Sequence, residues 1–453
     1  MEPFVIDGRD SVFVDLETGR KYARRFIAKG EAVIKYGCPI GVALADIEKN
    51  AFVHTHNLGT ALAGAGGYEY EPKPCALAPA EAPTVFAYER ADGRIGVRND
   101  VWIVPTVGCV NAAGEAIAKE TGAFCFSHPC GCSQLGDDLK RTQLLLRGLI
   151  LHPNAGGVLV LGLGCENNRI EDLRAMLGPF DPGRIRFLKA QDAADEVEAG
   201  IRTVRELQGL SALDRRTPVS AARLVLGLKC GGSDGYSGIT ANPLVGRVTD
   251  RLLASGGAAV MTEVPEMFGA EADLLSRCTD RAVFDRAAGM LSGYRRYFLD
   301  RGEGLGENPS PGNREGGITT LEEKSLGCVR KGGSGPVTDV LDYGDFVRKP
   351  GLSLLTGPGN DMIAVTNLTA AGCHMILFTT GRGTPLGGPI PTLKIASNTA
   401  LWNRKRRWLD FNAEGGSAEA LWRLTLETAS GKPAANEQNG ARAVALYRDG
   451  VTL

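Results

Sequence analysis

The sequence is poor in histidine and has no local metal-binding cysteine motif. It contains five histidines in 453 residues, and its eleven cysteines include no CxxC pair. The ligand spacing of zinc ribbons and zinc fingers is therefore absent. No apolar run approaches the length of a membrane-spanning helix, and no apolar segment of signal-peptide length follows Met1. We expect a cytoplasmic protein without a membrane partner, whose cysteines are reduced thiols or metal ligands.

The chain also has no excess of basic residues. Its formal net charge is −1, from 51 Lys and Arg against 52 Asp and Glu. A nucleic-acid partner requires a clustered basic surface, so we expect none. The sequence has no GxxxxGK[ST] phosphate loop and no HExxH zinc helix. Apolar residues make up 43% of the chain and charged residues 23%, which indicates a globular protein long enough for two to four domains.

What the sequence does contain is a series of apolar strands that end in glycine and reactive side chains. The stretch 126–138, FSHPCGCSQLGDD, places His128, Cys130 and Cys132 between a short apolar run and a helical pattern. Similar endings follow predicted strands at 101–104, 157–161, 223–228, 258–261 and 374–378. Catalytic groups gather at the carboxyl ends of strands in α/β proteins, so six such endings predict a shared crevice.

The pattern divides the chain into four parts. Residues 1–67 contain short β-type runs, and four prolines between 68 and 83 mark a linker. Residues 84–220 and 221–453 then form a first and a second α/β domain. We place the HTHN segment, His54 to Asn57, on a strand, where its two histidines would point the same way and could chelate a metal. Two surface histidines are the alternative. Residues 308–320 are too rich in turn-forming residues for regular structure.

Long motifs in a fixed order resemble the family of altronate and galactarate dehydratases across nearly the whole chain. They include VIKYGCPIG (33–41), HTHN (54–57), GVRND (96–100), WIVPTVGCVN (102–111), GCSQLGDD (131–138), GLGCENN (162–168), CGGSDGYSG (230–238), TEVPEMFGAE (262–271), NPSPGN (308–313), SLGC (325–328), GPGND (357–361) and AGCHMILFTTGRGTPLGG (371–388). The resemblance implies an α/β protein. A small N-terminal SAF-type β domain would precede Rossmann-like α/β domains with mainly parallel sheets.

The same resemblance implies a metal-dependent hydro-lyase of hexuronate catabolism. Such an enzyme would convert D-altronate, a small-molecule sugar acid, to 2-dehydro-3-deoxy-D-gluconate, with Fe2+ as cofactor and Mn2+ as a possible substitute. The HTHN segment, the ENN at 166–168 and the ending DGVTL at 449–453 favour altronate. Galactarate or another sugar acid, sulfolactate in a sulfo-lyase reaction, and a sensor that binds sugar acids without catalysis remain alternatives. A homo-oligomer is compatible with the sequence.

Dehydration requires a base near C2, an acid near the departing C3 oxygen, and a metal that stabilises the enediolate. The predicted catalytic residues are His128, Glu166 and Asp234. The predicted substrate-binding residues are Arg382, Thr384, Ser233 and Arg98. The predicted metal ligands are His54, His56, Cys132, Cys165 and Cys230, because thiolate sulfur suits iron and could hold one ion or an open cluster. The histidines could instead act as bases, and the cysteines could be small buried thiols.

Overall fold

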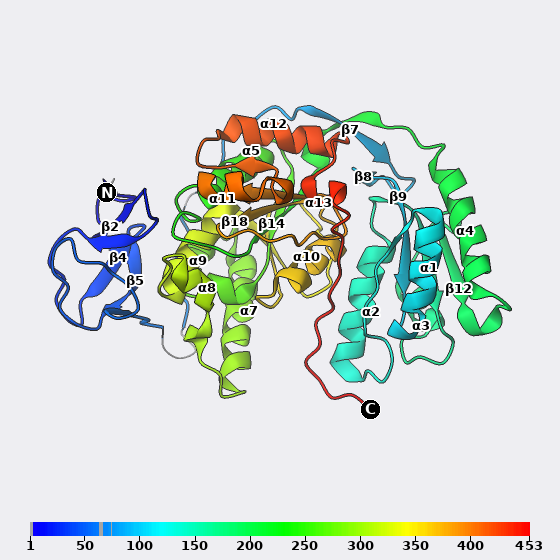
Figure 1. Ribbon diagram of the computed structural model, residues 1–453, viewed down its shortest axis with the longest axis horizontal. Coiled ribbons are helices and arrows are strands. Elements are labelled where there is room, and N and C mark those ends of the chain that lie inside the picture. The colour runs from blue at the N-terminus through cyan, green and yellow to red at the C-terminus, as the bar shows by residue number, and fades with distance from the viewer. Residues whose placement is uncertain (1–2, 63–66, 74) are drawn as a thin grey trace.

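The N-terminal part of the chain forms a small β domain, at the left of Figure 1. The structure is a computed structural model that describes residues 3–62, 67–73 and 75–453. Two three-stranded antiparallel sheets make up this domain. Their strands are β1 (Pro3–Phe4), β2 (Val12–Asp15), β3 (Lys21–Ala23), β4 (Ala32–Lys35), β5 (Cys38–Ala43) and β6 (Leu58–Gly59). Alternation along β4 buries Val33 and Lys35 on one face, so a lysine faces the rest of the molecule.

A four-stranded parallel sheet forms the core of the first α/β domain, at the right of Figure 1. Its strands, in the order β10–β9–β11–β12, are β10 (Phe124–Cys125), β9 (Asp100–Pro105), β11 (Ala155–Gly162) and β12 (Ile185–Lys189). Its helices are α1 (Asn111–Thr121), α2 (Gly136–Ile150), α3 (Ile170–Met176) and α4 (Glu196–Ser211). Alternate residues of β11 belong to two different apolar clusters, because helices cover both faces of the sheet.

A short antiparallel sheet marks the entry to and exit from this domain. It consists of β13 (Thr217–Ser220), β7 (Thr84–Glu89) and β8 (Ile95–Gly96). Because β13 pairs with β7, the residues just before the domain lie beside those just after it.

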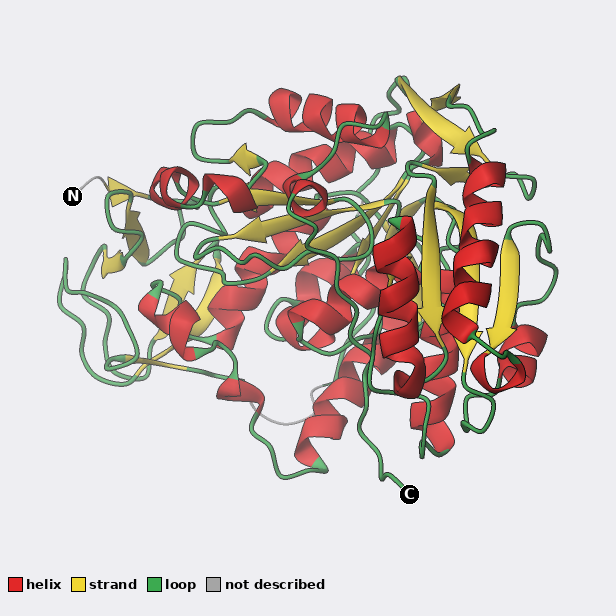
Figure 2. Cartoon of the chain, turned by 45° about the vertical axis from the view of Figure 1, so that its right-hand side comes forward, coloured by secondary structure: helices red, strands yellow, loops and turns green. Residues whose placement is uncertain are grey.

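The second α/β domain is built on a seven-stranded parallel sheet with helices on both sides (Figure 2). In spatial order its strands are β16 (Val337–Leu341), β17 (Gly351–Leu355), β15 (Ala258–Met261), β14 (Val225–Cys230), β18 (Met375–Thr380), β19 (Thr392–Ala396) and β20 (Phe411–Asn412). Its helices are α5 (Ala241–Ala254), α6 (Glu271–Ser276), α7 (Arg281–Leu299), α8 (Pro311–Glu315), α9 (Leu321–Val329), α10 (Asp361–Ala370), α11 (Thr399–Arg404), α12 (Ala418–Ala429) and α13 (Ala435–Gln438).

The structure confirms the fold class that the sequence predicts, with a small β domain followed by α/β units on parallel sheets. Two local predictions are wrong. The HTHN segment is a turn and not a strand, because the Asn57 side chain accepts a hydrogen bond from the His54 backbone N–H at 2.9 Å and closes it. The region 308–320 contains the short helix α8, which Ser310 caps.

The small β domain shares its apolar core with the second α/β domain. Val33 and Ile40 belong to the same buried cluster as Leu326 of α9 and Val264. This shared cluster fixes the HTHN turn beside the carboxyl ends of the seven-stranded sheet. Within the part of the chain that the structure describes, no helix is long and apolar enough to cross a membrane.

Candidate functional site

Two glycine-rich loops at the carboxyl ends of β14 and β18 form one edge of the larger sheet, here called the β14–β18 edge (residues 231–235 and 381–384). The Asp234 carboxylate is buried there. It accepts hydrogen bonds from the Ser237 N–H at 2.9 Å, the Ser397 hydroxyl at 2.9 Å and the Asn398 amide at 2.9 Å. Burial raises the pKa of the Asp234 carboxyl despite these donors. The edge therefore holds a carboxyl in a fixed orientation.

Helix α8 covers this edge. The Asn313 amide donates to the Ser233 carbonyl at 2.8 Å, and Arg382 Nη1 donates to the Gly312 carbonyl at 2.8 Å. Nη1 also pairs with Glu315 at 3.0 Å, and the Arg382 side chain is 44% exposed. Among the described residues no partner contacts Nε or Nη2, so one side of the guanidinium fork is free for a carboxylate. The structure thus brings together three predicted residues, Arg382, Ser233 and Asp234.

Thr384 lies at the same edge but has a role in the loop itself. Its hydroxyl accepts a hydrogen bond from the Leu386 N–H at 3.2 Å. Its carbonyl accepts one from the Lys394 ammonium at 3.0 Å. These contacts shape the loop that carries Arg382.

The HTHN turn of the small β domain also contacts α8. His54 Nε2 donates to the Arg314 carbonyl at 2.9 Å, which leaves Nδ1 as the basic nitrogen. Partial burial lowers the pKa of His54, so the ring is neutral near pH 7. The rings of His54 and His56 both stack on Phe52, with centroids 5.3 and 5.9 Å from it. This packing orders both rings around an aromatic side chain.

Behind the edge lies a buried network of charged side chains centred on α9. Glu323 pairs with Lys21 and with Lys35 of the small β domain, each at 2.8 Å. Burial would raise the pKa of Glu323, but the two ammonium groups outweigh it and hold that pKa at about 2. Lys324, the next residue, pairs with Glu266 at 2.8 Å. Each of these buried lysines is therefore paired with a carboxylate. None of the three was among the residues predicted from the sequence.

Cys230 lies deeper in this network, beside Glu266 and Cys328. The two sulfurs are 3.1 Å apart, and Glu266 Oε2 lies 3.2 Å from Cys230 Sγ and 3.4 Å from Cys328 Sγ. All three donor atoms lie within 4.8 Å of one another, as a metal site requires. A hydrogen bond from Cys328 lowers the pKa of Cys230 to about 6. The sequence predicted Cys230 but not Cys328 or Glu266, although the SLGC and TEVPEM motifs contain them.

The donor set of this triad suits iron, but its charge is already balanced. Lys331 Nζ lies 3.2 Å from Cys230 Sγ, and Lys324 neutralises Glu266. Cys230 is 1% exposed and Cys328 2% exposed. A metal held here would have to displace the Lys331 ammonium and would lie away from solvent.

His128 and Glu166 lie in the first α/β domain and brace its loops. His128 Nε2 donates to the Pro105 carbonyl at 2.8 Å, and Nδ1 accepts from the Cys130 N–H at 3.2 Å. Burial lowers the pKa of this ring. The Glu166 carboxylate accepts from the Thr106 hydroxyl at 2.6 Å and the Gly164 N–H at 2.6 Å. Both side chains contact the end of β9 or the residue after it, and both ring nitrogens of His128 have hydrogen-bond partners.

Cys132 and Cys165 lie on exposed loops of this same domain, whereas Cys230 is buried in the second α/β domain. The five predicted metal ligands are therefore distributed over three places: the HTHN turn, the loops of the first α/β domain and the buried triad. A third exposed cysteine, Cys109, follows β9. Cys109 belongs to the WIVPTVGCVN motif but was not among the predicted ligands.

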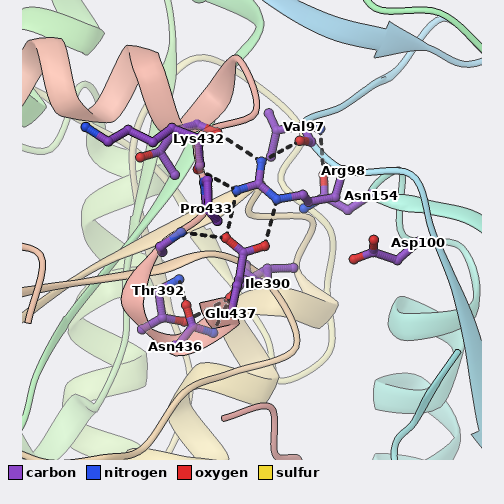
Figure 3. A network of polar contacts seen from close by, with 12 residues as sticks. Val97, Arg98, Asp100, Asn154, Ile390, Thr392, Lys432, Pro433, Asn436 and Glu437 are labelled. Atoms are coloured by element: carbon purple, nitrogen blue, oxygen red, sulfur yellow. Dashed lines mark hydrogen bonds and ion pairs between the residues drawn. The ribbon is translucent and has the colours of Figure 1, made fainter. Parts of the chain in front are cut away.

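Arg98 lies just before β9, at the amino end of the sheet, and joins the chain to its C-terminal segment (Figure 3). Its Nε and Nη2 bind both carboxylate oxygens of Glu437 at 2.7 Å. The remaining N–H groups donate to the carbonyls of Val97, Thr428 and Lys432. All five donors are used, so this guanidinium acts as a clamp between segments.

Three known protein-domain families match successive parts of the chain. Residues 8–61 match the altronate/galactarate dehydratase SAF domain, residues 87–210 the second domain of D-galactarate dehydratase/altronate hydrolase, and residues 221–452 the C-terminal domain of D-galactarate/altronate dehydratase. The chain is 49% identical to altronate dehydratase of Escherichia coli (strain K12) and 45% identical to altronate dehydratase of Bacillus subtilis (strain 168). Each alignment covers 97% of this chain and 93% of the relative. Identity to galactarate dehydratase (L-threo-forming) of Escherichia coli (strain K12) is 32%, over 91% of this chain and 86% of that relative.

Proposed function

The chain belongs to the family of altronate and galactarate dehydratases, and from this premise we propose that it removes water from D-altronate to give 2-dehydro-3-deoxy-D-gluconate. The observation that carries the proposal is the difference in identity. Two altronate dehydratases share 49% and 45% of aligned residues with the chain, against 32% for the galactarate enzyme. Galactarate is the second candidate substrate. None of the eleven cysteines forms a disulfide, which is consistent with an enzyme that works in the reducing cytoplasm.

The residues around α8 support the binding and proton-transfer steps. The free side of the Arg382 guanidinium is suited to the planar carboxylate of the sugar acid. The His54 ring, which donates from Nε2 to the Arg314 carbonyl of the same helix, is neutral and has Nδ1 as its basic nitrogen. We therefore assign His54, in preference to His128, to removal of the C2 proton. Asp234, whose pKa is raised by burial, is the carboxyl we assign to protonation of the departing hydroxyl.

The cofactor we propose is Fe2+, for which Mn2+ is a possible substitute. Its chemistry is to polarise the substrate oxygens and to stabilise the developing enediolate charge. Sulfur ligands that suit iron are present in two places, the triad of Cys230, Glu266 and Cys328, and the exposed loops that carry Cys132 and Cys165.

A substrate panel tests this function. The purified protein, reduced and loaded with Fe2+ under anaerobic conditions, is incubated with D-altronate, galactarate, D-gluconate and sulfolactate. We expect a 2-keto-3-deoxy acid from altronate at the highest kcat/KM, and no sulfite from sulfolactate. Chelation should abolish turnover, and Fe2+ should restore it. A preference for galactarate, or full turnover by the metal-free protein, would contradict the proposal.

A further inference from the structure

The three exposed cysteines of this chain all lie in one place. Of eleven free cysteines, Cys109, Cys132 and Cys165 are exposed, and the other eight are buried or partly buried. Unpaired cysteine is ordinarily among the most buried residue types, so three exposed thiols call for an explanation. Cys109 follows β9, Cys132 follows β10 and Cys165 follows β11, and these strands are neighbours in the order β10–β9–β11. All three strands are parallel, so the cysteines lie at the same edge of the sheet.

Hydrogen bonds tie the three loops to one another next to each cysteine. The Gly108 N–H donates to the Cys130 carbonyl at 3.0 Å, and the Asn168 N–H donates to the Gly131 carbonyl at 3.1 Å. The Asn168 amide also donates to the Thr106 carbonyl at 2.8 Å. Gly131 has φ +102°, and a Cβ there would lie 2.1 Å from the Thr106 oxygen. A side chain at position 131 would therefore prevent the loops from packing this closely.

The spacing of the three sulfurs distinguishes a cluster from a single ion. A tetrahedral metal with bonds of about 2.3 Å to sulfur needs thiolates roughly 3.8 Å apart. Within the part of the chain that the structure describes, the group that brings three such atoms within 4.8 Å of one another is Cys230, Glu266 and Cys328, and not the exposed cysteines. Three adjacent strand ends span roughly 10 Å, which is the scale of an iron–sulfur cluster with its ligands.

The surroundings of these cysteines also favour thiolate ligands. Helix α1, of eleven residues, begins at Asn111, so its positive end lies two residues after Cys109. The contacts of the other two sulfurs are neutral: Ser133 Oγ lies 3.8 Å from Cys132 Sγ, and Gln191 Nε2 lies 3.6 Å from Cys165 Sγ. No ammonium occupies the position that Lys331 takes beside Cys230, among the described contacts. A hydrogen bond to a ligand sulfur, as Gln191 makes, tunes iron–sulfur clusters.

From this geometry we infer that Cys109, Cys132 and Cys165 bind a [4Fe–4S] cluster in which one iron has no cysteine ligand. Cluster binding follows from the loops alone. It does not depend on the proposed function, whose substrate residues lie at the β14–β18 edge of the second α/β domain.

The test measures metal content and not activity alone. The full chain is purified without oxygen after reconstitution with iron and sulfide. About four irons and four acid-labile sulfides per chain are expected, with the brown absorption of a cluster. Cys109→Ser, Cys132→Ser and Cys165→Ser should each lose most of the sulfide. Cys125→Ser, in the same domain, and Cys230→Ser with Cys328→Ser should retain it. Circular dichroism spectra establish that each variant is folded, and Cys→Ala versions replace any that is not.

Each outcome has a distinct meaning for the two proposals. One iron or one zinc per chain without sulfide would overturn the cluster. Loss of sulfide in the Cys230 and Cys328 variant, with retention in the other three, would assign the iron to the buried triad instead. A wild-type protein that holds the cluster but leaves altronate unchanged would retain the inference and refute the proposed function. Altronate turnover by protein that takes up no sulfide on reconstitution would support the proposed function and overturn the cluster.

Discussion

Arg382 and His54 both contact α8 but have different proposed roles, so single substitutions should separate binding from chemistry. Arg382→Lys keeps the charge but loses the free edge of the guanidinium that we assign to the substrate carboxylate. Loss of one charge-assisted hydrogen bond costs about 1.5–3 kcal/mol, so KM for altronate should rise roughly tenfold or more while kcat changes little. His54→Gln removes the basic Nδ1 and should lower kcat about 100-fold or more. Steady-state kinetics on both variants gives the measurement.

The chain supplies a matched control for each substitution. Arg202→Lys changes an exposed arginine that pairs with Glu198 on α4, and it should leave both constants unchanged. His56→Gln changes the other histidine that stacks on Phe52. If His56→Gln abolishes turnover and His54→Gln does not, the base has been assigned to the wrong histidine. An unchanged KM in Arg382→Lys would remove that residue from substrate binding.

At the scale of elements, two buried histidines join the segment before β11 to the segment before β18. His152 Nε2 donates to the Cys373 carbonyl at 3.1 Å, and the Asn154 amide donates to the His374 carbonyl at 2.8 Å. His374 Nδ1 accepts from the Val225 N–H at 2.9 Å, which requires a neutral ring. Burial lowers the pKa of His152 to about 3 and that of His374 to about 4. Both rings therefore stay neutral in the folded protein under mildly acidic conditions.

This junction predicts a loss of stability as the pH falls. Below pH 6.5 the unfolded chain binds protons at both histidines while the folded chain does not. Lower pH therefore stabilises the unfolded state relative to the folded state. The contribution of the two neutral rings to the free energy of unfolding is fully present above pH 6.5 and is lost as the pH falls toward 4. Each group should contribute about 1.4 kcal/mol per pH unit over that range. Urea unfolding at pH 7.5 and 5.0 measures the total. His374→Asn, which keeps an acceptor for the Val225 N–H, should reduce the pH dependence; an identical slope in this variant would show that His374 is not responsible.

The sequence pattern predicts the buried strands and the loops that follow them, but not how the strands assemble into sheets. Apolar runs located β9, β11, β14, β15 and β18, and their glycine-rich ends located Asp234 and Arg382, because a buried parallel strand has a continuous apolar signature. The pattern does not tell which strand ends share a sheet. It therefore grouped Cys230 with Cys132, which belong to different sheets. Arg98 was predicted to bind the substrate, but it lies at the amino end of β9 and pairs with Glu437.

At the scale of the whole molecule, Glu323 links the small β domain to the second α/β domain. Its carboxylate is buried on α9, yet both cations that neutralise it, Lys21 and Lys35, come from the small β domain. No sequence pattern near α9 predicts these partners, since they lie 288 or more residues away. The HTHN turn reaches α8 only when this contact is formed, so the ion pairs and the active site depend on the same docking.

The last prediction follows from that dependence. Glu323→Gln leaves two buried ammonium groups without a counter-charge, and breaking a buried pair in this way costs about 3–5 kcal/mol. We expect the free energy of unfolding to fall by about this amount. Proteolysis within residues 68–83 should also accelerate, because the small β domain would separate from the second α/β domain before the rest of the chain unfolds. Replacing all three partners, with Lys21→Met, Lys35→Met and Glu323→Gln together, removes every charge and should recover most of the stability. Urea unfolding and timed proteolysis of the three proteins give the measurement. If Glu323→Gln is as stable and as resistant as the wild type, the ion pairs do not hold the domain, and the shared apolar core around Val33 and Ile40 must do so alone.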